Sequence, residues 1–240
     1  MMPPAAAENP PQTAAAMLAG FIRGHARLVI LTGAGCSTGS GIPDYRDREG
    51  HWKREPPVQF LDFVASAAVR RRYWARSLLG WRRIAEAQPN GAHHALAGLE
   101  RAGFVRHLIT QNVDGLHQKA GSRRVTDLHG CLDAVVCLAC GASGPRERFQ
   151  ARLAARNPRW LALTAGSAPD GDADLDGVDF SAFEVPDCEA CDGLLKPAVV
   201  FFGEALPAVR STGALAEVQQ ADALLAVGTS LMVWSGFRLA

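Results

Sequence analysis

Two C-x-x-C pairs, separated by 47 residues, constrain the fold of this chain more than any other feature of the sequence. The pairs are Cys137 with Cys140 and Cys188 with Cys191, and a glycine lies near each of them. Two such hooks bring four thiolates into a tetrahedron, which is the geometry of a structural zinc site with no position open for water. The spacing therefore predicts one structural zinc ion, with two disulfides or a redox pair as the alternatives. Cys36 and Cys131 are not expected to be ligands, because packing explains their positions.

The stretch from 131 to 195, which contains both pairs, differs in character from the rest of the chain. Residues 170 to 192 hold nine acidic side chains and no basic one, with glycine, proline and Asp-Gly breakers throughout. Such a segment is typical of a loop-rich insert between two strands of a sheet. We therefore expect 131–195 to be a small zinc-binding domain.

Short apolar runs bounded by turn residues recur along the remaining sequence. Because they are too short for helices and too continuous for half-exposed strands, they predict the central strands of a parallel sheet that is covered on both faces. The runs are 28–31, 105–109, 198–202 and 223–227.

Longer stretches between these runs have helical periodicity, namely 62–87 and 91–102. The first carries six arginines interleaved with large apolar residues such as Trp74 and Leu78. A solvated helix face with its aromatic side chains turned inward is the preferred interpretation. A route for a polyanionic partner is the alternative.

The charge balance excludes several classes of protein. The 240 residues include 25 Lys and Arg against 24 Asp and Glu, and 48% of them are hydrophobic. Disorder requires low hydrophobicity and high net charge, and a general nucleic-acid binder requires a positive excess. No apolar run reaches the ~18 residues of a membrane span, and residues 1–16 resemble neither a secretory signal nor a transit peptide. We expect a cytoplasmic protein with no membrane and no direct nucleic-acid partner, and a disordered tail over 1–20.

The first chemical motif follows the first apolar run. Gly33 and Gly35 permit a tight turn, and a helix expected to start at about Cys36 would offer amides to phosphate oxygens. The third glycine of a dinucleotide-binding turn is absent, so a turn without a ligand is the alternative. Tyr45 and Arg46, just behind the turn, favour a ligand because they can cover a flat ring and reach a pyrophosphate.

A polar cluster follows the second run. Gln111, Asn112 and Asp114 supply directed donors and acceptors for sugar hydroxyls and a carboxamide. In an open parallel sheet, ligands bind outside the carboxyl ends of the strands, so this cluster should face the same crevice as the glycine turn. A turn that only caps the next helix is the alternative.

His129 lies in Asp127-Leu128-His129-Gly130, at the end of another expected short strand. A histidine there can accept a proton from a substrate hydroxyl near neutral pH. The other six histidines lack such a setting, and structural or solvent roles are expected for them.

Together these motifs resemble the sirtuin family of NAD-dependent protein deacylases. The resemblance runs from about Ala26 to the end and includes GAGCSTGSGIPDYRD, TQNVDGLH, DLHG, the paired cysteine hooks, KPAVVFFGE and GTSL, in the family's order. The stretches at 72–76, 119–124, 168–172 and 234–236 are most similar to the class II branch. The resemblance implies an α/β fold with a Rossmann-type NAD-binding domain over 21–130 and 196–240, interrupted by a helical insert at about 50–90.

The resemblance also implies roles for individual residues. NAD would be held by Gly33, Ala34, Gly35, Ser37, Ile42, Pro43, Asp44, Tyr45, Arg46, Gln111, Asn112, Asp114, Gly228, Thr229 and Ser230. Within this set, Ile42 and Asp114 would bind the carboxamide, Tyr45 would cover the reacting sugar, and Gln111 and Asn112 would order the ribose and its water. The acyl-lysine peptide would add a strand between Val200, Phe201, Phe202, Gly203 and Glu204 on one side and Met232 and Val233 on the other.

The implied activity is removal of an acyl group from lysine, with His129 as general base and Asn112 as second catalytic residue, and with release of nicotinamide and O-acyl-ADP-ribose. A protein mono-ADP-ribosyltransferase of the same fold and a catalytically silent NAD- and zinc-binding module are the alternatives. Family members continue beyond the position of Ala240 through a helix and another strand. On this resemblance we expect the C-terminal part of the sheet to be missing, and the chain to be a fragment or poorly active.

Overall fold

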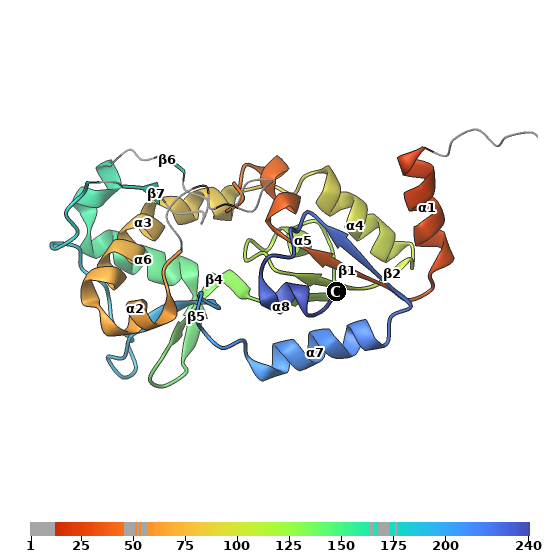
Figure 1. The fold of residues 1–240 in the computed structure, drawn as a ribbon. Helices are drawn as coiled ribbons and strands as arrows, with labels where there is room; N and C mark the ends of the chain where they lie inside the picture. The colour runs from red at the N-terminus through yellow and green to blue at the C-terminus, as the bar shows by residue number, and fades with distance from the viewer. Residues whose placement is uncertain are drawn as a thin grey trace, which may run out of the picture.

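The computed structural model describes residues 13–45, 51, 53, 57–163, 166–167, 173–175 and 177–240. A parallel sheet with flanking helices forms one side of the molecule, and a smaller unit around a second sheet forms the other side (Figure 1). None of the helices in the described part of the chain is long and apolar enough to cross a lipid bilayer.

The larger sheet has four parallel strands in the order β3-β2-β1-β9. Thr32 at the end of β1 lies beside both Thr110 and Val227, so the carboxyl ends of three strands are level. Three of the four runs predicted as strands of a parallel sheet are confirmed here, and β3 supplies the short strand expected before His129. The expectation of a central strand covered on both faces is wrong for 223–227, because β9 lies at the edge of the described sheet and is half-buried. The bounds are β1 (Leu28–Thr32), β2 (Val105–Thr110), β3 (Val125–Asp127) and β9 (Ala223–Val227).

Helices cover both faces of this sheet, which is why β1 is buried along its whole length. Leu28 and Ile30 pack in one cluster with residues of α1 (Ala14–Gly24) and α4 (Gly91–Arg101). Val29 and Leu31 pack on the opposite face with α7 (Ala208–Gln219) and with Leu239, just beyond α8 (Trp234–Phe237). The continuous apolar run of β1 therefore reflects two buried faces.

The expectation of a disordered tail over 1–20 is wrong for its later part. Thr13 caps α1 by accepting a hydrogen bond from the amide of Ala16, and Ile22 of the same helix is buried against the sheet. The alanine-rich composition of this segment favours a helix once one side can pack.

The arginine-rich stretch predicted as one helix over 62–87 consists of two helices, α2 (Phe60–Ala65) and α3 (Ala67–Glu86). Ser66 separates them in extended conformation, and its hydroxyl accepts a hydrogen bond from the amide of Val69. Tyr73, Trp74, Leu78 and Ile84 of α3 are buried, as the preferred interpretation predicts, and Trp74 has no exposed surface, whereas Leu79 and Trp81 are half-buried.

The smaller sheet has the order β5-β4-β8 and is antiparallel. The prediction that 198–202 forms a central strand of the parallel sheet is wrong, because β8 (Leu195–Val199) pairs with β4 (Gly130–Cys137) instead. An apolar run indicates a buried strand but does not identify its partner. The remaining elements of this unit are β5 (Ser143–Pro145), α6 (Arg146–Arg156), the 3-10 helix η3 (Pro158–Ala162), β6 (Gly166–Ser167) and β7 (Ala173–Asp174).

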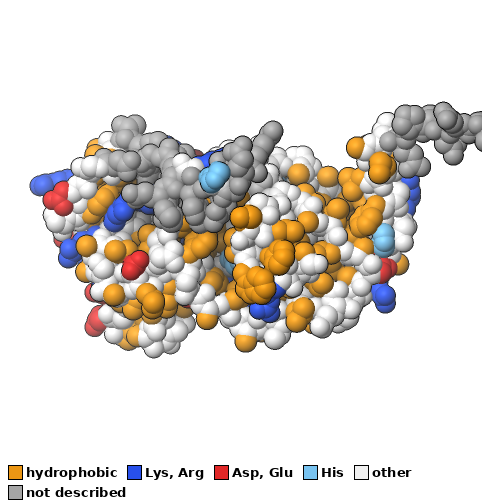
Figure 2. All heavy atoms as spheres, viewed as in Figure 1, with side chains coloured by type: hydrophobic (Ala, Val, Ile, Leu, Met, Phe, Trp, Pro, Cys, Tyr) orange, Lys and Arg blue, Asp and Glu red, His pale blue; other side chains and the backbone are white. Residues whose placement is uncertain are grey.

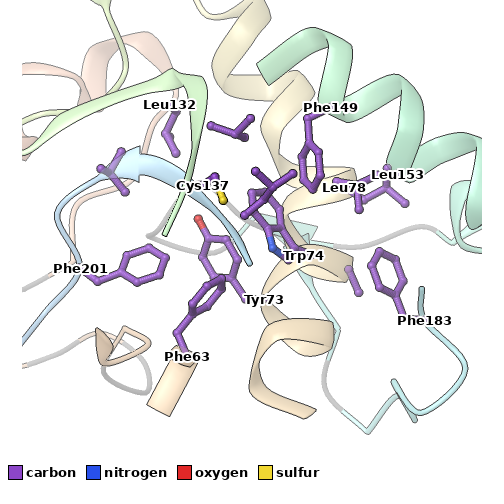
Figure 3. Packing of buried hydrophobic residues seen from close by; sticks show 14 of the residues in the cluster. Phe63, Tyr73, Trp74, Leu78, Leu132, Cys137, Phe149, Leu153, Phe183 and Phe201 are labelled. Atoms are coloured by element: carbon purple, nitrogen blue, oxygen red, sulfur yellow. The ribbon is translucent and has the colours of Figure 1, made fainter. Parts of the chain in front are cut away.

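An aromatic core joins this smaller sheet to α2, α3 and α6 (Figure 3). Trp74 packs against Phe149 of α6 with ring centroids 4.7 Å apart, and Tyr73 packs against both Phe63 and Phe201. The guanidinium of Arg146 is buried among these rings, 4.9 Å from the centroid of Trp81. The helices of the 50–90 insert therefore pack on the smaller unit.

Candidate functional site

The turn after β1 and the loop after β9 are in direct contact. The amide of Gly35 donates to the carbonyl oxygen of Gly228 (2.8 Å), and the amide of Gly33 donates to that of Val227 (3.2 Å). A Cβ atom on Gly35 would lie 2.9 Å from the Gly228 oxygen, and one on Gly33 would lie 2.7 Å from the Cβ of Thr229. These glycines are therefore required by the close approach of two loops, which no short motif reveals.

The expected α-helix starting at about Cys36 does not form. Two 3-10 turns, η1 (Ala34–Cys36) and η2 (Thr38–Ser40), take its place, and the amides of Cys36 and Ser37 bond back within the turn. Among the described residues, the backbone N–H groups of Ala34, Thr229 and Ser230 have no acceptor. These three amides are suitable donors for anionic oxygens at this edge of the sheet.

Asn112 connects the loop after β2 to the glycine turn. Its Nδ2 atom donates to the Gly33 carbonyl oxygen (3.0 Å) and to Ser37 Oγ (3.0 Å). Ser37 Oγ in turn donates to Asp114 Oδ2 (2.7 Å), and the Asp114 Oδ1 atom accepts from the amide of Leu116 (2.9 Å). The structure therefore unites three residues that the sequence assigned separately to the same crevice.

Gln111 makes a second connection across the crevice. Its backbone amide donates to the Thr32 carbonyl oxygen (3.0 Å), and its Nε2 atom donates to Thr229 Oγ1 (2.8 Å). Hydrogen bonds thus join the loops after β1, β2 and β9 into one connected surface, here called the floor of the crevice.

His129 lies beside this floor, between β3 and β4, with both ring nitrogens engaged. Its Nδ1 atom lies 3.0 Å from the Gln111 carbonyl oxygen, and its Nε2 atom lies 2.7 Å from Ser235 Oγ of α8. Burial lowers the pKa of His129 below its ordinary value, and the positive charge of Arg210 acts in the same direction against the opposing hydrogen bond to Gln111. The ring is therefore neutral at pH 7 and can act as a base.

His93 and His117 are buried and contact residues at the carboxyl edge of the sheet, in the structural roles expected for the other histidines. The His117 Nε2 atom lies 2.9 Å from Thr32 Oγ1. His93 is fully buried at the start of α4, where its Nδ1 atom accepts from the amide of Asn90 (3.2 Å). The Asn90 Nδ2 atom donates to the Cys36 carbonyl oxygen (2.9 Å) and thereby holds the glycine turn. The Asn90-to-His93 spacing of this capping box was the signal available in the sequence.

The group formed by Cys36, His93 and His117 has the composition of a metal site, but its tautomers disfavour one. Because the His93 Nδ1 atom accepts a hydrogen bond, the proton of the neutral ring is on Nε2, the nitrogen nearer to Ser37 Oγ. Burial lowers the pKa of His117 to about 4 and raises that of Cys36 to about 11. At pH 7 the three side chains are therefore neutral in the absence of an ion, and the proton on His93 Nε2 disfavours a ligand role for that nitrogen.

The loop that follows the glycine turn is described as far as Tyr45, so Arg46 lies outside the described residues. Ile42 packs against the aromatic core, Pro43 is half-buried, and Asp44 forms an ion pair with Lys53. The Tyr45 ring meets Phe202 edge to face, with centroids 6.5 Å apart. This contact brings the expected cofactor loop to the expected peptide segment.

The segment 200–204 extends β8 toward the crevice. The amide of Val200 donates to the His129 carbonyl oxygen (2.7 Å), which fixes the segment beside the histidine. Gly203 turns it with φ of 75°, and the Glu204 carboxylate accepts from the Phe201 amide (2.8 Å) and pairs with Lys196 (3.0 Å).

The other expected peptide-binding residues, Met232 and Val233, lead into α8. Met232 is exposed, as are Trp234 and Phe237, and hydrophobic side chains gather over α8 in the space-filling view (Figure 2). Met232 has no backbone hydrogen bond among the described residues, so its backbone groups are available to a ligand.

The four hook cysteines converge at the far end of β4. Cys137 and Cys191 Sγ atoms are 3.5 Å apart, and those of Cys140 and Cys188 are 3.8 Å apart. Zinc–sulfur bonds of about 2.3 Å in a tetrahedron require sulfur atoms about 3.8 Å apart, so the set fits one zinc ion. The backbone amide of Cys140 lowers the pKa of the Cys137 thiol, whereas the side chains of Cys140 and Cys137 raise that of Cys191, as expected for thiols crowded into one site. All four thiols are free, against the disulfide alternative.

The larger sheet is parallel and Rossmann-like, with a polar crevice at its carboxyl edge, and it is joined to a unit that carries a four-cysteine group. These features define a nucleotide-binding α/β protein with a zinc module. Comparison with known proteins gives the family. The pattern of the Sir2 family matches residues 33–235, and the chain belongs to this family.

The chain is similar over most of its length to named bacterial and mitochondrial proteins. It is 61% identical over 218 residues to NAD-dependent protein deacetylase 2 of Bradyrhizobium diazoefficiens, covering 91% of this chain and 80% of that protein. It is 50% identical over 221 residues to the mitochondrial NAD-dependent protein lipoamidase sirtuin-4 of Bos taurus, covering 91% and 70%. A solved structure of Sir2 with a p53 peptide and NAD+ is 29% identical, with a TM-score of 0.72, covering 93% of this chain and 79% of that one.

Proposed function

We propose that this protein is an NAD-dependent protein-lysine deacylase. The observation that carries the proposal is His129, a half-buried and neutral histidine whose Nδ1 atom is fixed on the Gln111 carbonyl at the carboxyl edge of the sheet. The relatives at about 60% identity, which are named NAD-dependent protein deacetylases, support the same activity. The more distant relative named as a lipoamidase supports acyl groups other than acetyl as further candidates.

NAD fits the donor set of the crevice. The amides of Ala34, Thr229 and Ser230 would bind phosphate or adenosine-side oxygens, beside the close-packed glycines 33, 35 and 228. The network of Ser37, Asn112 and Asp114 would bind the ribose and the carboxamide. Ile42, Pro43, Asp44, Tyr45, Arg46 and Gln111 complete the proposed set.

The acyl-lysine peptide would lie as an extra strand beside 200–204 and 232–233. Main-chain hydrogen bonds in such an arrangement give affinity with little sequence preference. The bond from the Val200 amide to the His129 carbonyl would hold the peptide segment in register with the base. Edge-to-face contact of Tyr45 with Phe202 would help to exclude water from the reacting atoms.

When bound, NAD supplies the sugar carbon from which nicotinamide leaves, and it is consumed in the reaction. His129 keeps one proton on Nδ1, so its Nε2 lone pair can accept a proton from a ribose hydroxyl. The hydroxyl oxygen would then be the nucleophile toward the acyl-derived carbon, so that the acyl group would be carried on ADP-ribose and the lysine amine would be released. Asn112 acts as a second catalytic residue by ordering the ribose and its water.

The four-cysteine unit would hold a zinc ion that is structural, because no ligand position remains for water. We propose residues 131–195 as this small domain and 21–130 with 196–240 as the NAD-binding domain. A cytoplasmic location is part of the proposal, since free zinc-binding thiols favour a reducing compartment.

A product assay tests the proposal directly. The purified chain, incubated with NAD and acetyl- or lipoyl-lysine peptides, should release nicotinamide, free lysine peptide and O-acyl-ADP-ribose in equal amounts by mass spectrometry. Modified protein carrying ADP-ribose, in place of the acylated product, would identify the transferase alternative. If the zinc-loaded protein releases no nicotinamide, both enzymatic functions are excluded, and the catalytically silent NAD- and zinc-binding module is the remaining alternative.

A further inference from the structure

Ser235 of α8 contacts the atom of His129 that the proposed reaction uses. Its Oγ atom lies 2.7 Å from His129 Nε2, a short distance for a hydrogen bond to nitrogen. The Gln111 carbonyl, on the other side of the ring, can only accept, so the neutral ring keeps its proton on Nδ1. Nε2 is therefore the acceptor, and the Ser235 hydroxyl is the donor.

The position of Ser235 is fixed by the residues around it. A Cβ atom on the next residue, Gly236, would lie 2.4 Å from Gln111 Oε1, so the backbone of α8 lies directly against the Gln111 side chain. That side chain is itself held by its bond to Thr229 Oγ1. Leu239 is buried in one cluster with Leu128, the neighbour of His129. Contacts on both sides thus hold the serine at the ring.

A serine in this position does not block proton transfer. Its hydroxyl oxygen has two lone pairs, and donating its proton to Nε2 leaves both of them free to accept. Ser235 is half-buried, so part of the residue remains accessible. The observed contact therefore allows a hydroxyl of the substrate to reach the base through Ser235.

We propose that Ser235 is a proton relay to His129, an inference that rests on the proposed deacylase function. As the ribose hydroxyl attacks, its proton passes to Ser235 Oγ, and the proton of Ser235 passes to His129 Nε2. The serine is unchanged at the end of the step, the substrate oxygen is an alkoxide nucleophile, and the ring is an imidazolium that still donates from Nδ1 to Gln111. Gly236 is a positioning residue, because it allows α8 to approach closely enough.

Kinetics of the variant Ser235→Ala test the relay. Loss of the hydroxyl should lower kcat for deacylated peptide at least about tenfold, since general acid-base help is worth ~10²- to 10⁴-fold. KM for NAD and peptide should stay within about twofold, because the relay acts on a proton and not on binding. Nicotinamide release, which precedes this step, should be affected less than peptide release, and Ser235→Thr should restore most of the rate. Ser211→Ala, a serine of α7 that bonds only within its own helix, is the matched control.

Unchanged kcat in Ser235→Ala would overturn the relay, and a raised kcat would identify the serine as a block over the base. Gly236→Ala provides a second route, because it keeps the hydroxyl but forces α8 and the Gln111 side chain apart. Its kcat should fall as in Ser235→Ala, and the double variant should be no slower than either single variant.

A measurement without substrate separates this inference from the proposed function. In ¹⁵N NMR of the zinc-loaded protein, with the His129 signal assigned from His129→Ala, the Nε2 resonance should move downfield in Ser235→Ala toward that of an unbonded acceptor. It should stay in place in Ser211→Ala. An Nε2 resonance that does not move in Ser235→Ala would overturn the contact, even if the enzyme is active. Absence of nicotinamide release by the wild-type chain would contradict the proposed function, and the NMR result would then decide the contact by itself.

Discussion

A Cβ atom on Gly228 would lie 2.3 Å from the backbone nitrogen of Cys36, so the loop after β9 and the turn after β1 touch through bare backbone. Gly228 also has a φ of 60°, a backbone conformation that residues other than glycine adopt at a cost of about 1–2 kcal/mol. The two effects combine at one position in the floor of the crevice.

Gly228→Ala should therefore lower the free energy of unfolding by at least about 2 kcal/mol and weaken NAD binding. Urea unfolding and calorimetric titration with NAD measure the two effects. Gly20→Ala is the matched control, because Gly20 lies in exposed α1 with nothing within 4 Å of its Cβ position. It should stabilise the protein by about 0.5–1 kcal/mol, and equal effects of the two substitutions would contradict the close-contact argument.

His129→Ala should retain the fold and the zinc ion but reduce turnover by ~10²- to 10⁴-fold, because it removes only the base. The comparison is kcat for deacylation, with circular dichroism and zinc content as checks on folding. His107→Ala is a suitable control, since His107 contacts Thr126 outside the crevice. Near wild-type deacylation by His129→Ala would rule out the assignment of the base.

Protonation of His117 should destabilise the protein in mild acid. Burial lowers the pKa of His117 from 6.5 to about 4, so between these pH values the unfolded chain binds a proton that the folded chain does not. Stability is unaffected above pH 6.5 and falls as the pH drops toward 4, by up to about 3 kcal/mol at 1.36 kcal/mol per pKa unit. Urea unfolding of wild type and His117→Gln at pH 7 and pH 5 checks this, and equal pH slopes in the two proteins would argue against it.

Cys188→Ser should lose the zinc ion and with it the folded state of the small unit, because a structural zinc contributes its binding energy to folding. Zinc content per chain should fall from one to near zero, with a lower melting temperature and a changed tryptophan signal from the adjacent aromatic core. Cys131→Ser should keep its zinc, since Cys131 is outside the four-cysteine group. Full zinc retention by Cys188→Ser would disprove the site.

The sequence predicted most of the larger sheet because β1 is buried along its whole length, β2 is buried at 108–110, and β9 is a continuous apolar run although it is only half-buried. It also predicted the zinc group, since two short hooks determine their own geometry. It did not predict the partner of β8, because the residues of that strand pack equally well in a parallel or an antiparallel sheet. The break at Ser66 was missed because one polar residue in a helical pattern is not a stop signal by itself.

Within the site, the sequence identified His129, Asn112 and Asp114 as residues of one crevice. It did not reveal why Gly33 and Gly35 are glycines, since the cause is the close approach of Thr229 and Gly228, almost 200 residues away along the chain. The contact of Ser235 with His129 is likewise a meeting of distant segments. Such contacts depend on tertiary packing, and no local pattern records them.

β4 begins at the residue after His129 and ends at Cys137, so one strand connects the proposed base to the metal unit. Because side chains alternate across a strand, adding or removing a single residue within β4 would turn Cys137 to the opposite face and shift the pairing with β8. Insertions and deletions within β4 should therefore not be tolerated. Natural variants of the protein must therefore keep the number of residues in this strand.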